Sequence, residues 1–155
     1  WRGLAEKAGA DLPAGSFASI FGVVIAGEHP DTGRRYTMVE PQMGGWGATP
    51  ERPGNDAMFS TNHGDTFNCP IEVAEARYGF EVISKSLGET GKAEGEHAGG
   101  RGLPGASEGG LNALLLSQGG QARAQPTFVS KLKVEPGDEI EVATAHGGGA
   151  VAARN

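Results

Sequence analysis

The sequence predicts a β-rich α+β fold, in which hairpins surround one short helix and long glycine-rich loops join them. Apolar residues alternate with polar ones in several short runs that turn residues separate, which is typical of strands. One stretch after Pro70 has the spacing of a helix. Glycine is abundant, with 27 in 155 residues, against an ordinary share of about 7%. A chain of this length fits one domain, so we expect residues 1–155 to form a single module.

The first half of the chain predicts a hairpin. Residues 16–27 (SFASIFGVVIAG) are an apolar and β-branched run bounded by glycines, which is typical of a buried strand. Residues 29–33 (HPDTG) have the composition of a turn, because Pro presets φ, Asp accepts local backbone bonds and Gly tolerates positive φ. Residues 35–40 (RYTMVE) are the expected return strand.

A short helix is expected after the first polar loops. Asn68 or Cys69 is the expected N-cap, with Pro70 in the first turn and Gly79 as the stop after the helix. Residues 80–87 (FEVISKSL) then alternate apolar with polar side chains, the period of a half-buried strand.

The second half is loop-rich and ends in a predicted hairpin. Residues 88–110 have loop composition, and residues 111–116 (LNALLL) are too short to assign to helix or strand. Two alternating strands are expected over 127–145, around a type II turn at 135–138 (EPGD). The three glycines that follow favour a flexible tail over 146–155.

Charge and cysteine content exclude several classes of partner. The net charge of −6 offers no basic face for a phosphate backbone, so nucleic acid is not an expected partner. The single cysteine excludes an intrachain disulfide framework and fits a reducing compartment, from which we expect a cytoplasmic protein. No apolar run approaches a membrane span. The chain opens on Trp1 and is rich in glycine loops that a neighbour would order, which favours a part or subunit of something larger.

The residues able to do chemistry gather between Glu40 and Gly79. A polar run covers residues 60–66 (STNHGDT), and Cys69 follows it. His63 and Asp65 stand two residues apart, but a metal needs three or four convergent ligands. We therefore expect no complete metal site in this chain. A polar loop that lines a site shared with other parts of an enzyme fits these residues better.

Other residues of this stretch each have two interpretations. Glu72 and Glu75 could act as an acid–base pair, although a solvated helix face explains the spacing better. Cys69 could be a nucleophile with His63 as its base, against the default of a buried inert thiol. Trp46, between glycines, is expected in an exposed loop as a lid or an interface anchor.

Two glycine patterns fail as phosphate-binding motifs. Gly100-x-Gly102-x-x-Gly105 matches the spacing of a dinucleotide fingerprint, but it follows no expected strand and Pro104 interrupts it. Gly88-x-x-Gly91-Lys92 is shorter than a P-loop, which has four residues between its glycines, and it lacks the Ser or Thr. The sequence therefore offers no phosphate cradle of recognised spacing.

Two segments carry a resemblance to a known family. They are Gly44-Gly45-Trp46-Gly47-Ala48, expected as a turn, and Asn62-His63-Gly64-Asp65-Thr66-x-Asn68-x-Pro70-x-Glu72. With most of residues 12–149, they resemble the C-terminal part of the hydantoinase B/oxoprolinase family, which includes the relatives that carboxylate acetone and acetophenone. Members of that family are several times longer than this chain. Residues 99–110 lack a strand pair that relatives carry, so a loop or deletion junction is expected there.

The resemblance implies a function in a larger assembly. It implies a part or subunit of an ATP-dependent hydantoinase B-like complex that hydrolyses a C–N bond of a cyclic amide such as hydantoin or 5-oxoproline. One alternative is a subunit of an ATP-dependent ketone carboxylase, and another is a non-catalytic docking module. A free-standing enzyme ranks behind these three. The implied partners are larger hydantoinase A-like and B-like subunits and a small-molecule substrate, with ATP and a divalent metal bound mainly outside this chain.

The resemblance also implies roles for individual residues. Asn62, His63 and Asp65 would orient or polarise the substrate and are the expected catalytic residues. The expected substrate-binding residues are Gly44, Gly45 and Gly47, where backbone could approach the substrate closely, together with Trp46, Thr66, Asn68 and Glu72. No metal ligand is assigned in this chain.

Overall fold

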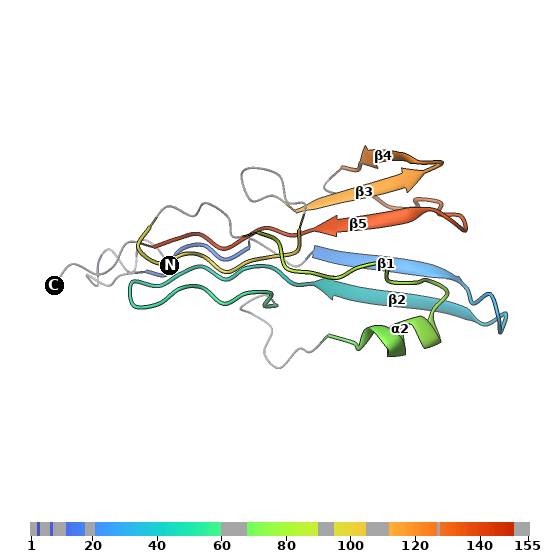
Figure 1. Ribbon diagram of the computed structural model, residues 1–155, viewed down its shortest axis with the longest axis horizontal. Helices are drawn as coiled ribbons and strands as arrows, with labels where there is room; N and C mark the ends of the chain where they lie inside the picture. Colours follow the sequence, from blue (N-terminus) through green and yellow to red (C-terminus); the bar gives the residue numbers. More distant parts are fainter. Residues whose placement is uncertain are drawn as a thin grey trace.

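A computed structural model of the chain describes residues 3, 7, 12–17, 21–59, 68–89, 95–104, 112–126 and 128–150. Its helix and strands are β1 (Phe21–Glu28), β2 (Arg35–Gln42), α2 (Ile71–Arg77), β3 (Ala113–Gln118), β4 (Gln121–Ala124) and β5 (Glu139–Ala143) (Figure 1). The strands form two antiparallel sheets, β1-β2 and β4-β3-β5. The predicted β-rich α+β class is confirmed. Within the described part of the chain, no helix is long and apolar enough to cross a membrane.

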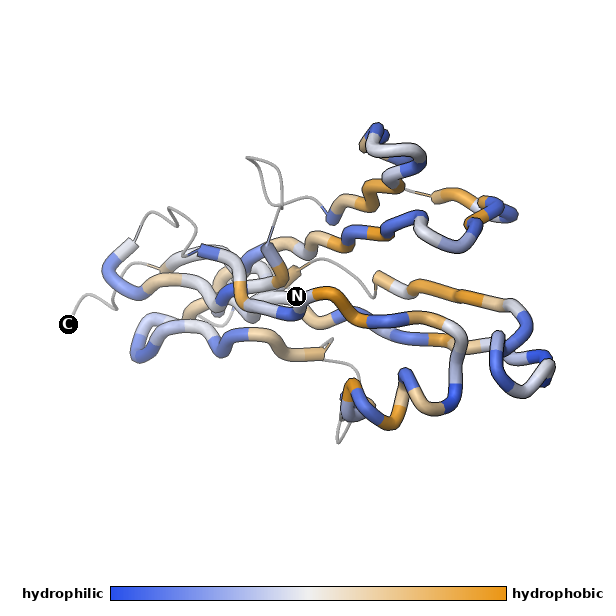
Figure 2. The backbone as a smooth tube through the Cα atoms, turned by 45° about the vertical axis from the view of Figure 1, so that its right-hand side comes forward, coloured by the Kyte–Doolittle hydropathy of each residue, from blue (hydrophilic) through white to orange (hydrophobic). Residues whose placement is uncertain are grey.

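The first predicted hairpin is confirmed as β1-β2. The register runs from Phe21 opposite Gln42 to Glu28 opposite Arg35, and the turn closes with a bond from the Gly33 amide to the His29 carbonyl of 2.9 Å. The expected burial of its first strand is wrong. Val24 and Val39, which lie opposite each other, are 65% and 67% exposed. Burial alternates along both strands, so only the opposite face of the hairpin is partly covered by other residues. Figure 2 shows this apolar stretch along the strands.

The second sheet contains a hairpin that the sequence analysis did not predict. β3 arises from the apolar run at 111–116, and Gly119 and Gly120 connect it to β4. Their φ values of 56° and 77° are those of a type I′ turn, the two-residue connection that matches strand twist.

The last predicted hairpin is correct in its turn and wrong in its first strand. Gly137 has φ 92° and the Asp138 amide donates to the Glu135 carbonyl at 3.0 Å, as in a type II turn. The described residues before the turn, 128–134, form no strand, and Thr127 lies outside the described residues. β5 pairs instead with β3, where Val142 faces Leu114.

The helix is confirmed, but its ends differ from expectation. Pro70 is itself the N-cap, with no side-chain capping bond, so neither Asn68 nor Cys69 caps the helix. Tyr78 is the C-cap in extended conformation. Gly79 follows it without a positive φ, and its small size serves packing instead, because a Cβ there would lie 2.8 Å from Cδ of Pro30 in the hairpin turn.

The predicted strand over 80–87 is wrong. These residues belong to no ladder in the structure. The backbone amide of Val82 donates instead to Oε1 of Glu75 on the helix, at 2.7 Å. A side chain thus takes the place of a strand partner, and alternation alone could not reveal this.

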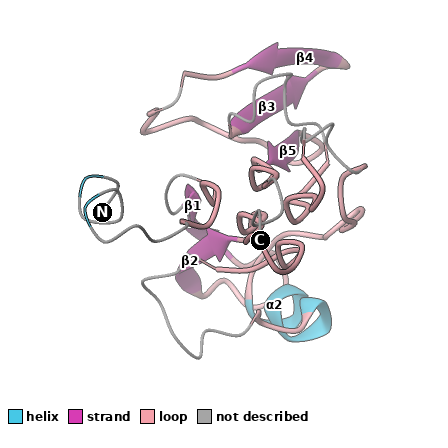
Figure 3. Cartoon of the chain, turned by 90° about the vertical axis from the view of Figure 1, so that its left-hand side faces the viewer, coloured by secondary structure: helices cyan, strands magenta, loops and turns pink. Residues whose placement is uncertain are grey.

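Five extended segments outside the sheets run side by side and form what we call the glycine bundle. Figure 1 shows them at the opposite end of the molecule from the hairpin turns, and Figure 3 looks along them as loops between β5 and α2. The segment 44–48 is bonded to all four others, whereas a strand in a sheet has at most two neighbours. The glycine bundle consists of residues 14–17, 44–48, 54–58, 97–103 and 144–150.

Hydrogen bonds in the glycine bundle recur at every third residue. The amides of Gly45 and Ala48 donate to the carbonyls of Ala145 and Gly148. The amides of residues 54 and 57 likewise donate to the carbonyls of residues 98 and 101. A period of three is that of a polyproline II helix, which has three residues per turn and makes no internal bonds. The bundle is therefore held by bonds between segments, in several directions.

Glycine is required where these segments cross most closely. A Cβ on Gly45 would overlap the carbonyl oxygen of Gly100, and one on Gly147 would overlap that of Trp46. Among the described residues, half of the buried apolar side chains are alanines, and they come from the glycine bundle, from β2, β3 and β5, and from α2. They are Phe17, Met38, Ala48, Ala74, Leu103, Leu116, Ala143 and Ala145.

The expectation of a flexible tail over 146–155 does not hold for residues 146–150. The amide of Gly147 donates to the Gly100 carbonyl at 2.8 Å, and Ala150 exchanges two backbone bonds with His97. These glycines are packed within the bundle. Residues 151–155 lie outside the described residues.

Candidate functional site

The expected catalytic residues Asn62, His63 and Asp65, with Thr66, lie outside the described residues. The structure does describe the residues on either side of that polar run. The indole Nε1 of Trp46 donates to the Phe59 carbonyl at 2.6 Å, and Nδ2 of Asn68 lies 2.8 Å from Sδ of Met43. Both flanks of residues 60–67 are thus joined to the segment 43–46.

The structure gives Gly44, Gly45 and Gly47 a use different from the expected one. The segment that contains them is extended rather than a turn. A Cβ on Gly44 would overlap the Phe17 ring, and one on Gly47 would overlap the Ala14 carbonyl. The close approach that these glycines permit is made in this structure by neighbouring parts of the chain. Their expected contact with a substrate stays a prediction.

Trp46 is half-buried, not in an exposed loop. Its indole is fixed by the bond to Phe59, and its carbonyl accepts the Gly100 amide at 2.8 Å. Trp46 therefore links the flank of the polar run to the centre of the glycine bundle.

The other expected residues lie near the start of the helix. The Oδ1 atom of Asn68 is buried and has no hydrogen-bond partner among the described residues, and Cys69 is a half-buried free thiol. Glu72 is exposed in the first turn of α2, as expected for a solvated face. Glu75 is bonded to the Val82 amide, so the two carboxylates do not form an acid–base pair in this arrangement.

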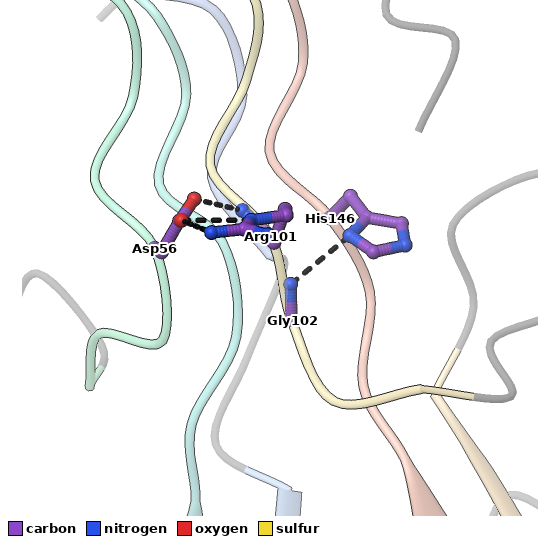
Figure 4. A network of polar contacts seen from close by, with 4 residues as sticks. All are labelled: Asp56, Arg101, Gly102 and His146. Carbon is purple, nitrogen blue, oxygen red and sulfur yellow. Dashed lines mark hydrogen bonds and ion pairs between the residues drawn. The ribbon is translucent and has the colours of Figure 1, made fainter. Parts of the chain in front are cut away.

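A polar network that the sequence analysis missed connects three segments of the glycine bundle (Figure 4). The Asp56 carboxylate accepts hydrogen bonds from Nε of Arg101 at 2.8 Å and from Nη2 at 2.6 Å. Oδ1 of Asp56 also accepts the Arg101 backbone amide at 2.7 Å. Beside them, Nδ1 of His146 accepts the Gly102 amide at 3.0 Å. No local motif signals this network, because its members lie 44 and 45 residues apart in the sequence.

The ion pair shifts the pKa of both partners. The hydrogen bonds from the Arg101 side chain lower the pKa of Asp56 below its usual range. Partial burial opposes this shift, and the Arg101 amide and the charges of Arg101 and His146 reinforce it. Hydrogen bonding to Asp56, with its charge, raises the pKa of Arg101. Asp56 and Arg101 therefore stay ionised at neutral pH and clamp two segments together.

A buried hydroxyl extends this network toward the predicted site. Oγ1 of Thr144 accepts the Leu103 amide at 2.8 Å and donates to the Met43 carbonyl. Oδ1 of Asn112 accepts the Ala145 amide at 2.9 Å. The backbone at Met43, next to the flank of residues 60–67, is thus held by the side chain of Thr144 from the C-terminal half.

Ligand-binding features of the described residues are sparse. No group of three or more His, Cys, Asp or Glu side chains among them is arranged to hold a metal ion. A shallow cavity of about 430 Å³ lies between the first hairpin turn and the end of α2. None of the expected site residues lines it. What the described part of the site offers is a hydrogen-bonded contact at each flank of residues 60–67.

Comparison of the chain with protein families gives one match. The model of the family hydantoinase B/oxoprolinase matches residues 1–108, which include both flanks of the polar run. No curated protein and no solved structure matches the chain.

Proposed function

The chain belongs to the hydantoinase B/oxoprolinase family, and we propose from this that it forms one wall of the active site of an ATP-dependent, multi-subunit enzyme. The proposed reaction is the hydrolysis of a C–N bond in a cyclic amide of the hydantoin or 5-oxoproline type. The observation that carries the proposal is the anchoring of residues 60–67 at both flanks, through Trp46 and Asn68.

The proposed roles follow from the chemistry of an amide carbonyl. Its oxygen gains negative charge when a nucleophile attacks, and donors held in place stabilise that charge. The imidazole of His63 and the amide of Asn62 are such donors. Asp65, two residues away, would accept a hydrogen bond from one N–H of the imidazole and so fix which ring nitrogen carries the proton.

Nucleotide and metal are assigned to the larger subunits. The described residues offer neither a metal cluster nor a P-loop, so the fit of ATP or a divalent metal to them is poor. The proposed partners are therefore larger hydantoinase A-like and B-like subunits. The proposed compartment is the cytoplasm, supported by the single cysteine.

A second candidate function is a non-catalytic docking module. The observation that favours it is the use of Gly44, Gly45 and Gly47 in packing the chain against itself. In that case residues 60–67 would contact a larger subunit without touching substrate.

Reconstitution tests the proposed function. The chain is combined with its copurifying subunits and assayed with ATP, once with a hydantoin or 5-oxoproline and once with a ketone and bicarbonate. ATP-dependent ring opening that requires the chain is expected. If the assembly carboxylates the ketone instead, the carboxylase alternative replaces the proposed hydrolysis. Equal ring opening with and without the chain would contradict an active-site role.

A further inference from the structure

The segment 128–134 has the sequence pattern of a strand, but it pairs with no other segment that the structure describes. Its side chains Phe128, Leu132 and Val134 are all exposed. None of its amides donates a hydrogen bond to another backbone group in the described part of the chain. Lys131 has φ 60°, which is outside the range of a strand residue. The segment therefore combines exposed apolar side chains with backbone amides that have no strand to bind.

The outer edge of β5 is open in the same described part of the chain. The strand order is β4-β3-β5, and β5 pairs only with β3 (Figure 1). Alternate residues of an edge strand turn their N–H and C=O groups outward, where they form a template for another strand. Glu139, Ile140 and Glu141 are exposed along this edge. β5 can therefore accept one more strand.

The turn at 135–138 explains why the segment does not pair with β5 of its own chain. The Asp138 amide donates to the Glu135 carbonyl at 3.0 Å, which makes this a two-residue turn. Oδ2 of Asp138 also accepts the Glu135 amide at 2.9 Å and Nε2 of Gln118 at 2.7 Å. Because the length of a turn sets the register of the strands that it joins, these bonds fix the register within one chain.

That register places unlike side chains opposite each other. Continued from the turn, the ladder would set Lys133 opposite Ile140. It would likewise set Leu132 opposite Glu141. Residues directly opposite in an antiparallel pair lie on the same face of the sheet, and the face of Ile140 also carries the buried Leu116 of β3. Closing the hairpin would therefore bring a lysine onto the apolar face.

We propose that residues 128–134 pair with the outer edge of β5 in a second copy of this chain. The turn does not constrain pairing between two copies, so the register can shift by one residue. Leu132 then lies opposite Ile140, and apolar side chains share one face. Lys131 lies opposite Glu141 on the other face, and opposite charges directly across a strand pair stabilise it.

Charge complementarity selects this edge and this partner. The second lysine of the segment, Lys133, comes opposite Glu139 at the end of the ladder next to the turn. The other edge of the sheet, β4, is four residues long and carries Arg123, which would repel the lysines. Pairing also returns Lys131 to strand dihedrals and removes the strain of its positive φ. Each copy has one such segment and one such edge, so the exchange is reciprocal and closes at two copies.

Sedimentation velocity of the full chain, run over a wide range of concentrations, tests the proposal. The wild type is expected to pass from monomer to dimer as its concentration rises, without larger species. Lys131→Glu and Glu141→Lys should each weaken the dimer about tenfold, because each turns two symmetry-related attractive pairs into repulsive ones.

Mixing the two variants distinguishes pairing between copies from other effects of charge. In the mixture each segment meets an edge of opposite charge, so a dimer of about wild-type affinity is expected. Arg34→Glu, at an exposed position before β2, changes the net charge as Lys131→Glu does and should leave the dimer unchanged. Glu139→Gln should also have little effect, because it removes only a solvent-screened pair at the end of the ladder.

A wild-type chain that stays monomeric at every concentration overturns the proposal, including the case in which a strand of a larger subunit covers β5 instead. A mixture of the two variants that dimerises as weakly as each variant alone overturns it as well. If a variant does not fold, amide hydrogen exchange of the wild type decides. The protection of residues 128–134 should rise with concentration, and constant protection contradicts the pairing. None of these measurements uses enzymatic activity, so the dimer and the proposed function can fail separately.

Discussion

Asp56 and Arg101 are joined by three hydrogen bonds of 2.6 to 2.8 Å, one of them from the Arg101 backbone. The pair fastens the segment before the polar run to residues 97–103. About a third of each side chain is exposed, 35% for Asp56 and 36% for Arg101, so solvent screens the attraction.

The first prediction concerns this pair and pH. The folded-state pKa of Asp56 is lowered, so the pair stabilises the fold above the unfolded pKa near 4 and loses its effect as the pH falls through the folded pKa. Asp56→Ala should cost about 1 kcal/mol at pH 7, a screened ion pair plus a lost backbone bond. Urea unfolding should show the difference shrinking below pH 4 and in high salt. A difference that is constant from pH 7 to pH 2 would argue against the ion pair.

The second prediction concerns the glycine bundle. Gly45→Ala should destabilise the chain by about 3 kcal/mol or more, because the new methyl group overlaps the Gly100 carbonyl and backbone cannot yield easily. Gly22→Ala is the control, since a Cβ there meets nothing within 4 Å, and it should change stability by less than about 1 kcal/mol. Thermal unfolding of both variants gives the comparison. Equal stability would mean that the segments do not cross as described.

The third prediction concerns Ala57, whose φ of 49° is in the left-handed region. That conformation costs a residue with a Cβ roughly 1–2 kcal/mol, partly offset by the flexibility of glycine in the unfolded chain. Ala57→Gly should therefore stabilise the chain by about 0.5 kcal/mol. Ala76→Gly, at an exposed position of α2, should instead destabilise it by about 1 kcal/mol. Chemical denaturation shows whether each variant gains or loses stability. A loss of stability in both variants would show that Ala57 is unstrained.

Local sequence signals predicted the elements that local interactions determine. The β1-β2 hairpin, the helix after Pro70 and the type II turn at Gly137 all follow from short-range rules on apolar runs, proline and glycine. The hairpin at Gly119 and Gly120 was also readable, because two glycines between apolar and alternating runs are a type I′ signal. This pair of glycines therefore indicates a strand on either side, which are β3 and β4 in the structure.

Contacts between distant segments were not predictable from one sequence. The glycine bundle has no hydrophobic period, because backbone groups rather than side chains make its contacts. Residues 44–48 therefore resembled a turn, and residues 146–150 a tail. Residues 80–87 alternate like a strand, yet Glu75 supplies the bond to Val82 that a partner strand would have made. In the candidate site, no local sequence motif marks Asp56 or Arg101 as a partner of the other, because they lie 45 residues apart.

The central claim is that residues 60–67 act on the substrate within an assembled enzyme. Its most direct test is kcat/KM of the reconstituted assembly carrying His63→Ala or Asn62→Ala, with Glu139→Gln at the exposed start of β5 as a control for handling and assembly. A loss of about 100-fold is expected for each of the first two variants, the scale of one positioned catalytic donor, with subunit stoichiometry unchanged. An assembly that forms normally and keeps its full kcat/KM with both variants would contradict the claim.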